Sequence, residues 1–430
     1  MASFQSLPNE LLEVIVNNLP RQDLPHIRLT CSRLAQIATK PMFRKLVLGT
    51  STESGKGFVE ILASEELRTC VSQLTFNSFQ VGQRVCERGA ATLPNEVIHT
   101  LRNVCAFENL GSVCINLPWN RRATGSLRNV VPQQYHFQIL DMILAKLLTP
   151  SGRSLPIKTL ALHNLPSKNT PVTEKKGFDR FLGRLSTLQL GVWMHDKGVP
   201  ESRDHIDLSI KCLDFFAKLP VVWLTPAQNL STLALCSDDH WGYYPKVDIE
   251  KTYFPSLQAL VLGKLCFSHD SKLEWLLKHA TSLQKLYLVD CSILREAFFL
   301  GQQDNDGYPA GRIQRGNTDQ RSYTYERCWS YYLMEMSLSL KKLTRFVMHS
   351  RKSAAASFSS WRDIPPSRDE RYIRLFADGV FEPCTVEQEL TSEKEDWDAL
   401  ANLLEVTTAR SNRRRGPNDR QFEESIPGYW

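Results

Sequence analysis

The chain has 430 residues, of which 42% are apolar and 23% are charged, close to the proportions of ordinary globular proteins. This composition excludes a wholly disordered or collagen-like chain, and no apolar run approaches the roughly 18–20 residues that span a bilayer. Of the net charge of +6, residues 410–420 contribute +4 through five arginines and one aspartate. We therefore assign the basic excess to a short polar tail, with a weak nuclear-import signal as the alternative, and expect neither nucleic acid nor membrane as a partner.

Eleven cysteines are scattered along the chain without a CxxC pair. The first residues, MASFQSLPNELLEV, lack a basic segment, so no signal peptide is expected. The thiols are then expected to be reduced, in a protein of the cytoplasm or nucleus, and their spacing does not favour zinc. No metal or cofactor is predicted.

Residues 1–46 predict three short helices. Four apolar side chains recur at the spacing that aligns them on one face of the first helix: Leu12, Ile15, Val16 and Leu19. Asp23 is expected to cap the second helix and Thr30 the third, which ends at Pro41. Because three short helices cannot bury a large core alone, many of these apolar side chains must face the rest of the chain or a partner.

The same segment resembles an F-box in the order and spacing of its residues. The matching motifs are Leu7-Pro8-x-Glu10-Leu11-Leu12-x-x-Ile15, Leu19-Pro20-x-x-Asp23-Leu24, Leu29-x-Cys31-x-Arg33-Leu34 and Pro41-x-Phe43-Arg44. Two positions depart from the family's pattern, since Thr30 replaces an aliphatic residue and Leu34 replaces a tryptophan. Both departures soften the surface that faces the adaptor.

The resemblance implies docking onto the Skp-family adaptor of a Skp–cullin–F-box ubiquitin ligase. By position, seven residues would supply much of the apolar docking surface: Leu7, Pro8, Leu12, Ile15, Leu19, Leu24 and Leu29. Such docking is a form of helix-in-groove recognition, in which a few apolar anchors carry most of the binding energy. Without the motif, the same residues could equally be a local three-helix core.

After a connector at residues 47–70, residues 71–350 repeat the pattern L-x-x-L-x-L. Clear copies are centred on Leu160, Leu188, Leu233, Leu260 and Leu286, and weaker copies on Leu74, Val113 and Phe346. Among the five clear copies, three of the four intervals fit the 20–29-residue period of leucine-rich repeats, and the interval from Leu188 to Leu233 requires an insertion. Helical patterns lie between several of the copies. The sequence predicts an α/β fold: a small N-terminal three-helix F-box followed by an irregular leucine-rich-repeat solenoid, a horseshoe of roughly eight units.

In such a solenoid, the side chains that alternate with the buried leucines line the concave face. These are Ala161, His163, Gln189, Ala234, Val261, Lys285, Tyr287, Arg345 and His349. The segment 236–245 adds aromatic side chains at an expected loop tip, where they can anchor a partner or fold back onto the solenoid. The candidate partner-binding residues are Gln189, Tyr287, Lys285, Arg345, His349, Trp241 and Tyr243. The ordinary alternative is a solvated sheet face.

The remaining segments predict insertions and a closing element. Residues 191–204 and 301–325 interrupt the repeats, and the second reads as a long polar loop that is either functional or unstructured. Residues 351–370 are expected to form a linker, 371–409 a C-terminal cap whose helix begins near Ser392, and 410–430 a mobile basic tail.

No catalytic motif stands out. Residues 49–57 superficially resemble a phosphate loop, but their spacing is wrong and the magnesium-binding hydroxyl is missing. HExxH and GxSxG are absent from the sequence. We predict a protein that is not an enzyme: the substrate-recognition subunit of the ligase, whose F-box binds the adaptor and cullin core and whose repeats bind an unidentified target protein. A non-catalytic repeat scaffold without a ubiquitylation role is the alternative.

Overall fold

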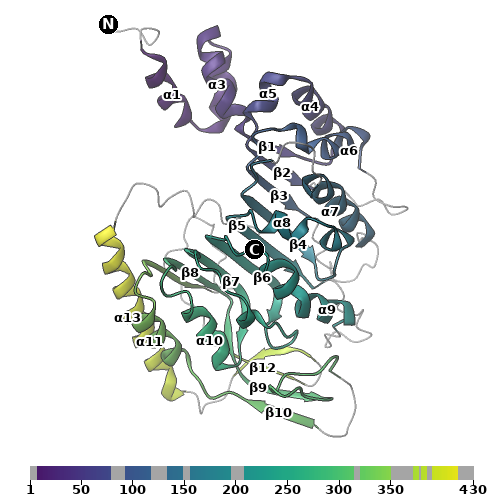
Figure 1. Cartoon of the computed structure of the whole chain (residues 1–430). Helices are drawn as coiled ribbons and strands as arrows, with labels where there is room; N and C mark the ends of the chain where they lie inside the picture. Colours follow the sequence, from purple (N-terminus) through teal and green to yellow (C-terminus); the bar gives the residue numbers. More distant parts are fainter. Residues whose placement is uncertain are drawn as a thin grey trace. The chain divides into compact units, whose positions relative to one another are not determined.

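The computed structural model falls into two compact units (Figure 1). Unit 1 comprises Met1–Asn164 and Thr170–Phe181, and unit 2 comprises Leu165–Asn169 and Leu182–Trp430. Within them the structure describes residues 7–78, 93–117, 133–148, 155–194, 208–313, 320–349, 371–376, 379–384 and 390–414.

Unit 1 begins with the three expected helices. They are α1 (Asn9–Asn17), α2 (Leu24–Arg28), which follows the short 3-10 helix η2 (Arg21–Asp23), and α3 (Ser32–Arg44). Three details of the prediction are wrong. Asp23 stands at the N-cap position of α2, but its side chain makes no capping hydrogen bond. Thr30 does not cap α3, because its hydroxyl donates to the Ile27 carbonyl instead. Pro41 does not end α3, which continues for one more turn because a proline near a helix end costs few hydrogen bonds.

A parallel sheet follows in unit 1. Its strands are β1 (Lys45–Leu48), β2 (Gln73–Asn77), β3 (Ser112–Asn116) and β4 (Thr159–Pro166), paired in that order. The helices are α4 (Thr52–Ala63), α5 (Glu65–Cys70), α6 (Asn95–Arg102), η3 (Val104–Ala106), α7 (Gln133–Leu148), η4 (Pro171–Glu174) and α8 (Phe178–Leu182). Figure 1 shows α4, α6 and α7 along one side of the strands.

Unit 2 has a larger, mixed and open sheet. Its strands are β5 (Thr187–Trp193), β6 (Thr232–Trp241), β7 (Ala259–Phe267), β8 (Lys285–Val289), β9 (Ser292–Leu300), β10 (Gln320–Thr324), β11 (Arg345–His349), β12 (Tyr372–Leu375) and β13 (Phe381–Pro383). Strands β5, β6, β7, β8 and β11 pair in parallel. The end of β7 also pairs with β9, which starts a branch with parallel β12 and antiparallel β10 and β13.

The helical segments of unit 2 lie between and after these strands. They are α9 (Ile210–Leu219), η5 (Pro220–Leu224), η6 (Ile249–Lys251), α10 (Asp270–Leu277), α11 (Trp329–Ser339) and α13 (Leu390–Arg414). Helix α13 continues five residues into the segment expected to be a mobile tail. The expected linker at 351–370, the capping position Ser392 and most of the tail lie outside the described residues or side chains.

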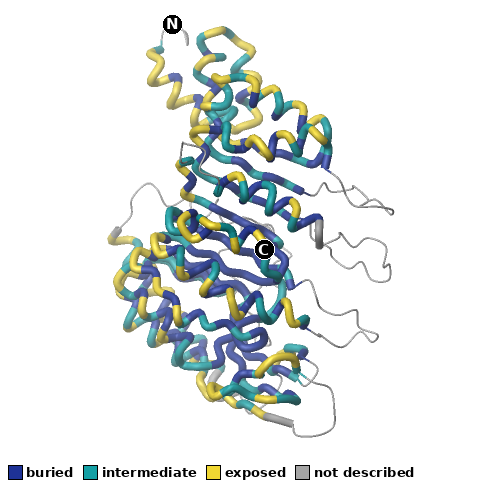
Figure 2. The backbone as a smooth tube through the Cα atoms, turned by 45° about the vertical axis from the view of Figure 1, so that its right-hand side comes forward, coloured by how far each residue is buried: buried dark blue, intermediate teal, exposed yellow. Residues whose placement is uncertain are grey.

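The repeated leucines occupy matching positions on neighbouring strands. The middle leucines pair in the order Leu188, Leu233, Leu260 and Leu286, and Phe346 continues the row. All five side chains are buried, and in Figure 2 buried residues follow the strands of this unit. The period of two in the sequence therefore comes from strands whose leucine-bearing face is packed.

Part of the insertion at 301–325 is ordered. The Asp304 carboxylate accepts hydrogen bonds from the backbone N–H groups of Asp306 and Tyr308, each at 3.0 Å. Lys246 binds the same carboxylate at 2.7 Å. Further along, residues 320–324 form β10 on the edge of β9. The described part of this insertion is thus a packed element of unit 2.

The segment that resembles a phosphate loop forms the start of α4. The Ser51 hydroxyl caps the helix by accepting from the Ser54 N–H at 3.1 Å. A Cβ added to Gly55 would lie 2.7 Å from the Glu96 Cβ and 2.9 Å from the Val97 backbone nitrogen of α6. Gly55 is therefore needed for the close approach of α4 and α6.

We expect Gly55→Ala to destabilise unit 1 by about 1–3 kcal/mol, because the added methyl overpacks the contact with α6. Gly57 of the same helix is the matched control, since an added Cβ there meets nothing within 4 Å. Gly57→Ala should stabilise by up to about 1 kcal/mol through helix propensity. Urea unfolding of both variants measures this, and an equal effect of the two would contradict the packing role.

Candidate functional site

The three N-terminal helices share a small core of their own. Its buried members are Leu12, Val16, Leu24, Leu34 and Ala38. The half-buried side chains packed against them are Leu7, Leu19, Ile27, Cys31, Ile37 and Met42. Some of the apolar residues of this segment therefore form the core that holds the three helices together.

A second set of apolar side chains in α1 faces away from this core. The exposed strip of α1 consists of Leu11, Val14 and Ile15, with exposed fractions of 50%, 59% and 39%. Leu29, after α2, is 85% exposed, and Pro8 is also exposed. Large apolar side chains that gather on a surface mark a site of association. A polar helix surface would be expected here if the segment served only as a solvated cap.

The seven residues predicted for docking therefore separate into three groups. Leu12 and Leu24 are buried, with exposed fractions of 1% and 3%. Leu7 and Leu19 are half-buried against the core. Pro8, Ile15 and Leu29 are exposed.

Sequence reasoning overlooked Leu11 and Val14 as members of the exposed strip. Leu11 and Ile15 are four residues apart, as are Leu12 and Val16, so both pairs fit the helical period. The periodicity cannot say which pair faces the core. The sequence did contain an indication: the apolar residues of α1 cover more of the helix surface than the single stripe needed by a helix that packs on one side.

The N-terminal edge of α1 is tied to α3 by Arg33. Its Nε donates to the Asn9 side-chain oxygen at 2.7 Å, and its Nη2 donates to the Leu7 carbonyl at 2.6 Å. Pro8, at the N-cap position of α1, makes no side-chain cap. A guanidinium suits this place because its fixed fork can satisfy two acceptors at once.

The row of unit 2 residues that was expected to line an open concave face differs from that expectation. Residues Gln189, Ala234, Val261 and Tyr287 lie in register across β5 to β8, and all are buried. Lys285, Arg345 and His349 on β8 and β11 are half-buried. In unit 1, Ala161 and His163 of β4 are buried as well.

Of the two expected arrangements for Trp241 and Tyr243, an exposed loop tip is wrong, because both side chains are folded back onto their own unit. Strand β6 continues to Trp241, whose indole N–H donates to the Gly263 carbonyl at 2.7 Å. The Tyr243 hydroxyl donates to the Gly307 carbonyl at 3.0 Å, and its ring lies near Tyr308. Both side chains are buried. The Trp241 ring stacks on Phe216 of α9, and Tyr243 packs against the 301–313 segment, so neither is available as an anchor.

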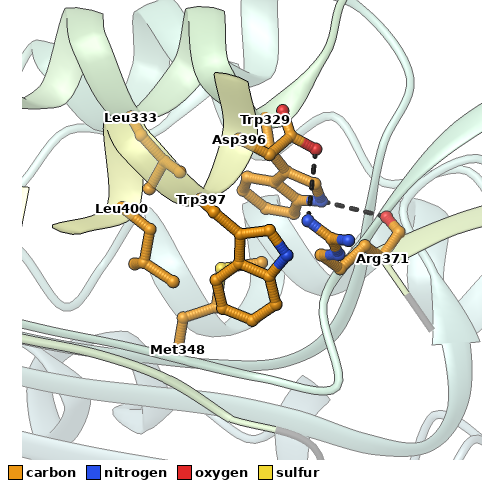
Figure 3. A pocket seen from close by; sticks show the side chains of 7 residues that line it. All are labelled: Trp329, Leu333, Met348, Arg371, Asp396, Trp397 and Leu400. Carbon is orange, nitrogen blue, oxygen red and sulfur yellow. Dashed lines mark hydrogen bonds and ion pairs between the residues drawn. The ribbon is translucent and has the colours of Figure 1, made fainter. Parts of the chain in front are cut away.

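A small cavity lies between α11, α13, β11 and residue 371 (Figure 3). Its lining residues are Trp329, Leu333, Met348, Arg371, Asp396, Trp397 and Leu400. At about 10 Å³ it has space for no more than a water molecule. In the part of the chain that the structure describes, no group of three histidine, cysteine or acidic side chains is placed to hold a metal. None of the described helices is long and apolar enough to cross a membrane.

Burial lowers the pKa of several histidines. The pKa values of His163 and His240 fall from 6.5 to about 4. Those of His269 and His279 are also lowered, again mainly by desolvation. His279 illustrates the cause, because it packs against three aromatic rings. Its Nε2 accepts from the Phe254 N–H at 3.2 Å, which requires a neutral imidazole.

We expect the protein to lose stability on mild acidification. Below pH 6.5 the unfolded chain takes up protons on these histidines while the folded chain does not, so the free energy of unfolding falls as the pH falls towards 4. His163 and His240 alone should each contribute a loss of about 1.4 kcal/mol at pH 5.5 relative to neutral pH. Urea unfolding at pH 7.5 and 5.5 measures this. His279→Gln should reduce the difference, and stability that is equal at both pH values would contradict the expectation.

Comparison with known proteins agrees with the geometry of the N-terminal segment. The sequence model of the F-box domain matches residues 4–46. A curated Arabidopsis thaliana protein named as an FBD-associated F-box protein is 30% identical over 159 residues. That match covers 36% of this chain and 38% of the relative. Residues 4–46 are therefore an F-box domain, and the remainder of the chain has to be interpreted from its own structure.

Proposed function

We propose that this chain, which carries an F-box domain at residues 4–46, is the substrate-recognition subunit of a Skp–cullin–F-box ubiquitin ligase. The observation that carries the proposal is the exposed strip of α1 outside a separate F-box core. A module that only had to fold would gain nothing from three large apolar side chains in water.

The proposed docking surface is the exposed strip of α1 together with Pro8 and Leu29. Leu7 and Leu19 border it, while Leu12 and Leu24 support it from the F-box core. The adaptor would bury these anchors in an apolar groove, and truncating a central anchor typically costs more than 1–2 kcal/mol of binding free energy.

The rest of the chain supports the reading of an irregular leucine-rich-repeat solenoid. In each unit, parallel strands carry large apolar residues at matching positions, and these are mostly leucines in unit 2. Helices follow several of the strands. We propose residues 47–70 as the connector, 71–350 as the repeat region and 371–409 as the cap. The antiparallel strands β10 and β13 are additions to a simple repeat array.

For the target protein we propose the half-buried basic residues at the end of the parallel ladder. Lys285 of β8 pairs with Arg345 of β11, and His349 lies at the other end of β11. These side chains adjoin the buried row that contains Gln189 and Tyr287, which would fix the shape of the face without contributing open contact area.

In the proposed mechanism this chain brings the target close to the ligase core and catalyses no reaction itself. The F-box holds the ligase core, the second surface holds the target, and the local concentration of target lysines near the charged ubiquitin carrier rises. The protein would then act in the cytoplasm or nucleus, with the adaptor and cullin as partners.

Affinity purification followed by mass spectrometry tests the proposal. The full chain should recover the adaptor, the cullin and target proteins, and a chain lacking residues 7–46 should lose the first two and keep the targets. Recovery without any adaptor would refute the proposal. Recovery of the adaptor with unchanged lifetimes of all bound proteins after deletion of this chain would favour a repeat scaffold instead.

A further inference from the structure

We infer that Arg33 is a positioning residue that holds the N-terminal edge of the F-box in the shape needed for docking. The inference rests on the proposed function, since it deepens the account of the same surface. It concerns a residue whose own side chain is half-buried and lies beside the proposed anchors.

The edge in question is the segment Leu7-Pro8-Asn9. Pro8 precedes the first turn of α1 and is exposed, and Leu7 is half-buried against the core. Arg33 binds both ends of this segment from α3, across 26 and 24 residues of sequence. One hydrogen bond fixes the backbone at Leu7 and the other fixes the Asn9 side chain at the start of the helix.

This arrangement matters because an edge that is ordered before docking loses less conformational entropy when the partner arrives. Apolar packing of Leu7 alone does not fix the direction of its carbonyl. The two donors of one guanidinium do, because they lie in a plane with fixed spacing. A lysine at this position carries the same charge, but it cannot hold both acceptors with the same geometry.

The burial of Arg33 distinguishes this role from that of a surface charge. A charge that served mainly to attract an acidic partner would be expected to extend into solvent, as Lys40 of the same helix does. Arg33 instead directs its Nε and one terminal nitrogen at acceptors of its own chain. Its effect on docking is therefore transmitted through Leu7, Pro8 and Asn9.

The test measures the affinity of the full chain for a purified Skp-family adaptor by calorimetry. We expect Arg33→Ala to weaken binding at least tenfold, and Arg33→Lys to weaken it severalfold although the charge is kept. Asn9→Ala should weaken binding less, and its effect should not add to that of Arg33→Ala because both remove the same contact. Lys40→Ala, which removes an equal charge from an exposed site on α3, should bind like the parent chain.

Hydrogen exchange on the free chain supplies a second readout. Amides of residues 9–12 should exchange faster in Arg33→Ala, while those of α3 stay protected and the unfolding temperature changes little. If Arg33→Lys binds like the parent and Lys40→Ala binds as weakly as Arg33→Ala, charge is the cause and the inference is wrong. It is also wrong if Arg33→Ala keeps parental affinity and exchange. If the parent chain itself fails to bind, the proposed function fails with it, whereas failure of the inference alone leaves parental binding intact.

Discussion

Replacing Ile15 by aspartate is expected to weaken adaptor binding at least a hundredfold while leaving the F-box folded. Ile15 is the third member of the exposed strip of α1, beside Leu11 and Val14. In the complex the new carboxylate would be buried among apolar groups without a partner, at a cost of several kcal/mol. A hundredfold loss corresponds to about 2.7 kcal/mol. In the free chain the position is open to water, so folding is little affected.

Two comparisons make this experiment specific. Gln36→Asp places the same charge at an exposed position of α3 outside the proposed surface and should leave the affinity unchanged. Leu12→Asp, in contrast, should unfold the module, because Leu12 is buried in the F-box core. Circular dichroism and limited proteolysis separate loss of docking from loss of fold. Parental affinity in Ile15→Asp would show that the strip does not face the adaptor.

The second large effect is expected at Asp396, where replacement by alanine should destabilise unit 2 by about 3–5 kcal/mol. The Asp396 carboxylate caps α11 by accepting from the Ser330 N–H at 2.7 Å, and it accepts from the Tyr372 hydroxyl at 2.7 Å. It also lies 3.4 Å from Arg371, which is 5% exposed (Figure 3). Removing the carboxylate leaves a buried guanidinium and a helix end without this partner.

Helix α13 contacts α11 at its other end as well, which gives a matched set of variants. Arg410 donates to the Leu340 carbonyl at 2.8 Å and to the Ser337 carbonyl at 3.2 Å, where the negative end of the α11 dipole lies. Arg410→Ala should cost about 1–3 kcal/mol. Arg413→Ala, three residues further and exposed, should cost almost nothing. Urea unfolding measures all three, and a parental midpoint for Asp396→Ala would contradict the role of this contact.

Local sequence patterns were sufficient to predict the F-box helices and the leucine-bearing strands. The F-box helices follow from apolar spacing and prolines, and the strands follow from pairs such as Leu233 and Leu235, which recur at a period of two. These features depend only on neighbours in sequence. The resemblance to a known motif also led to the prediction that Ile15 is a docking residue, and the structure places its side chain at the surface.

The rest depends on contacts between distant segments, which no local pattern encodes. From the sequence alone, either Leu12 or Ile15 could face the F-box core, and only the packing of α1 against α3 decides between them. The burial of Tyr243 follows from residues about 60 positions later, such as Gly307, and Trp241 packs on Phe216 and donates to Gly263. The branch formed by β9 and β12 arises because β7 pairs with two strands at different points along its length. Aromatic and charged side chains in a polar segment therefore looked like surface features although they are packed.

We propose above all that the F-box of this chain docks on a Skp-family adaptor through the exposed strip of α1. Titration calorimetry of the purified full chain with the purified adaptor tests it most directly. We expect a one-to-one complex with a Kd below about 1 μM, equivalent to roughly −8 kcal/mol, and the loss of that heat in Ile15→Asp. Absence of binding at an adaptor concentration of about 50 μM, with the F-box shown to be folded, would contradict the claim.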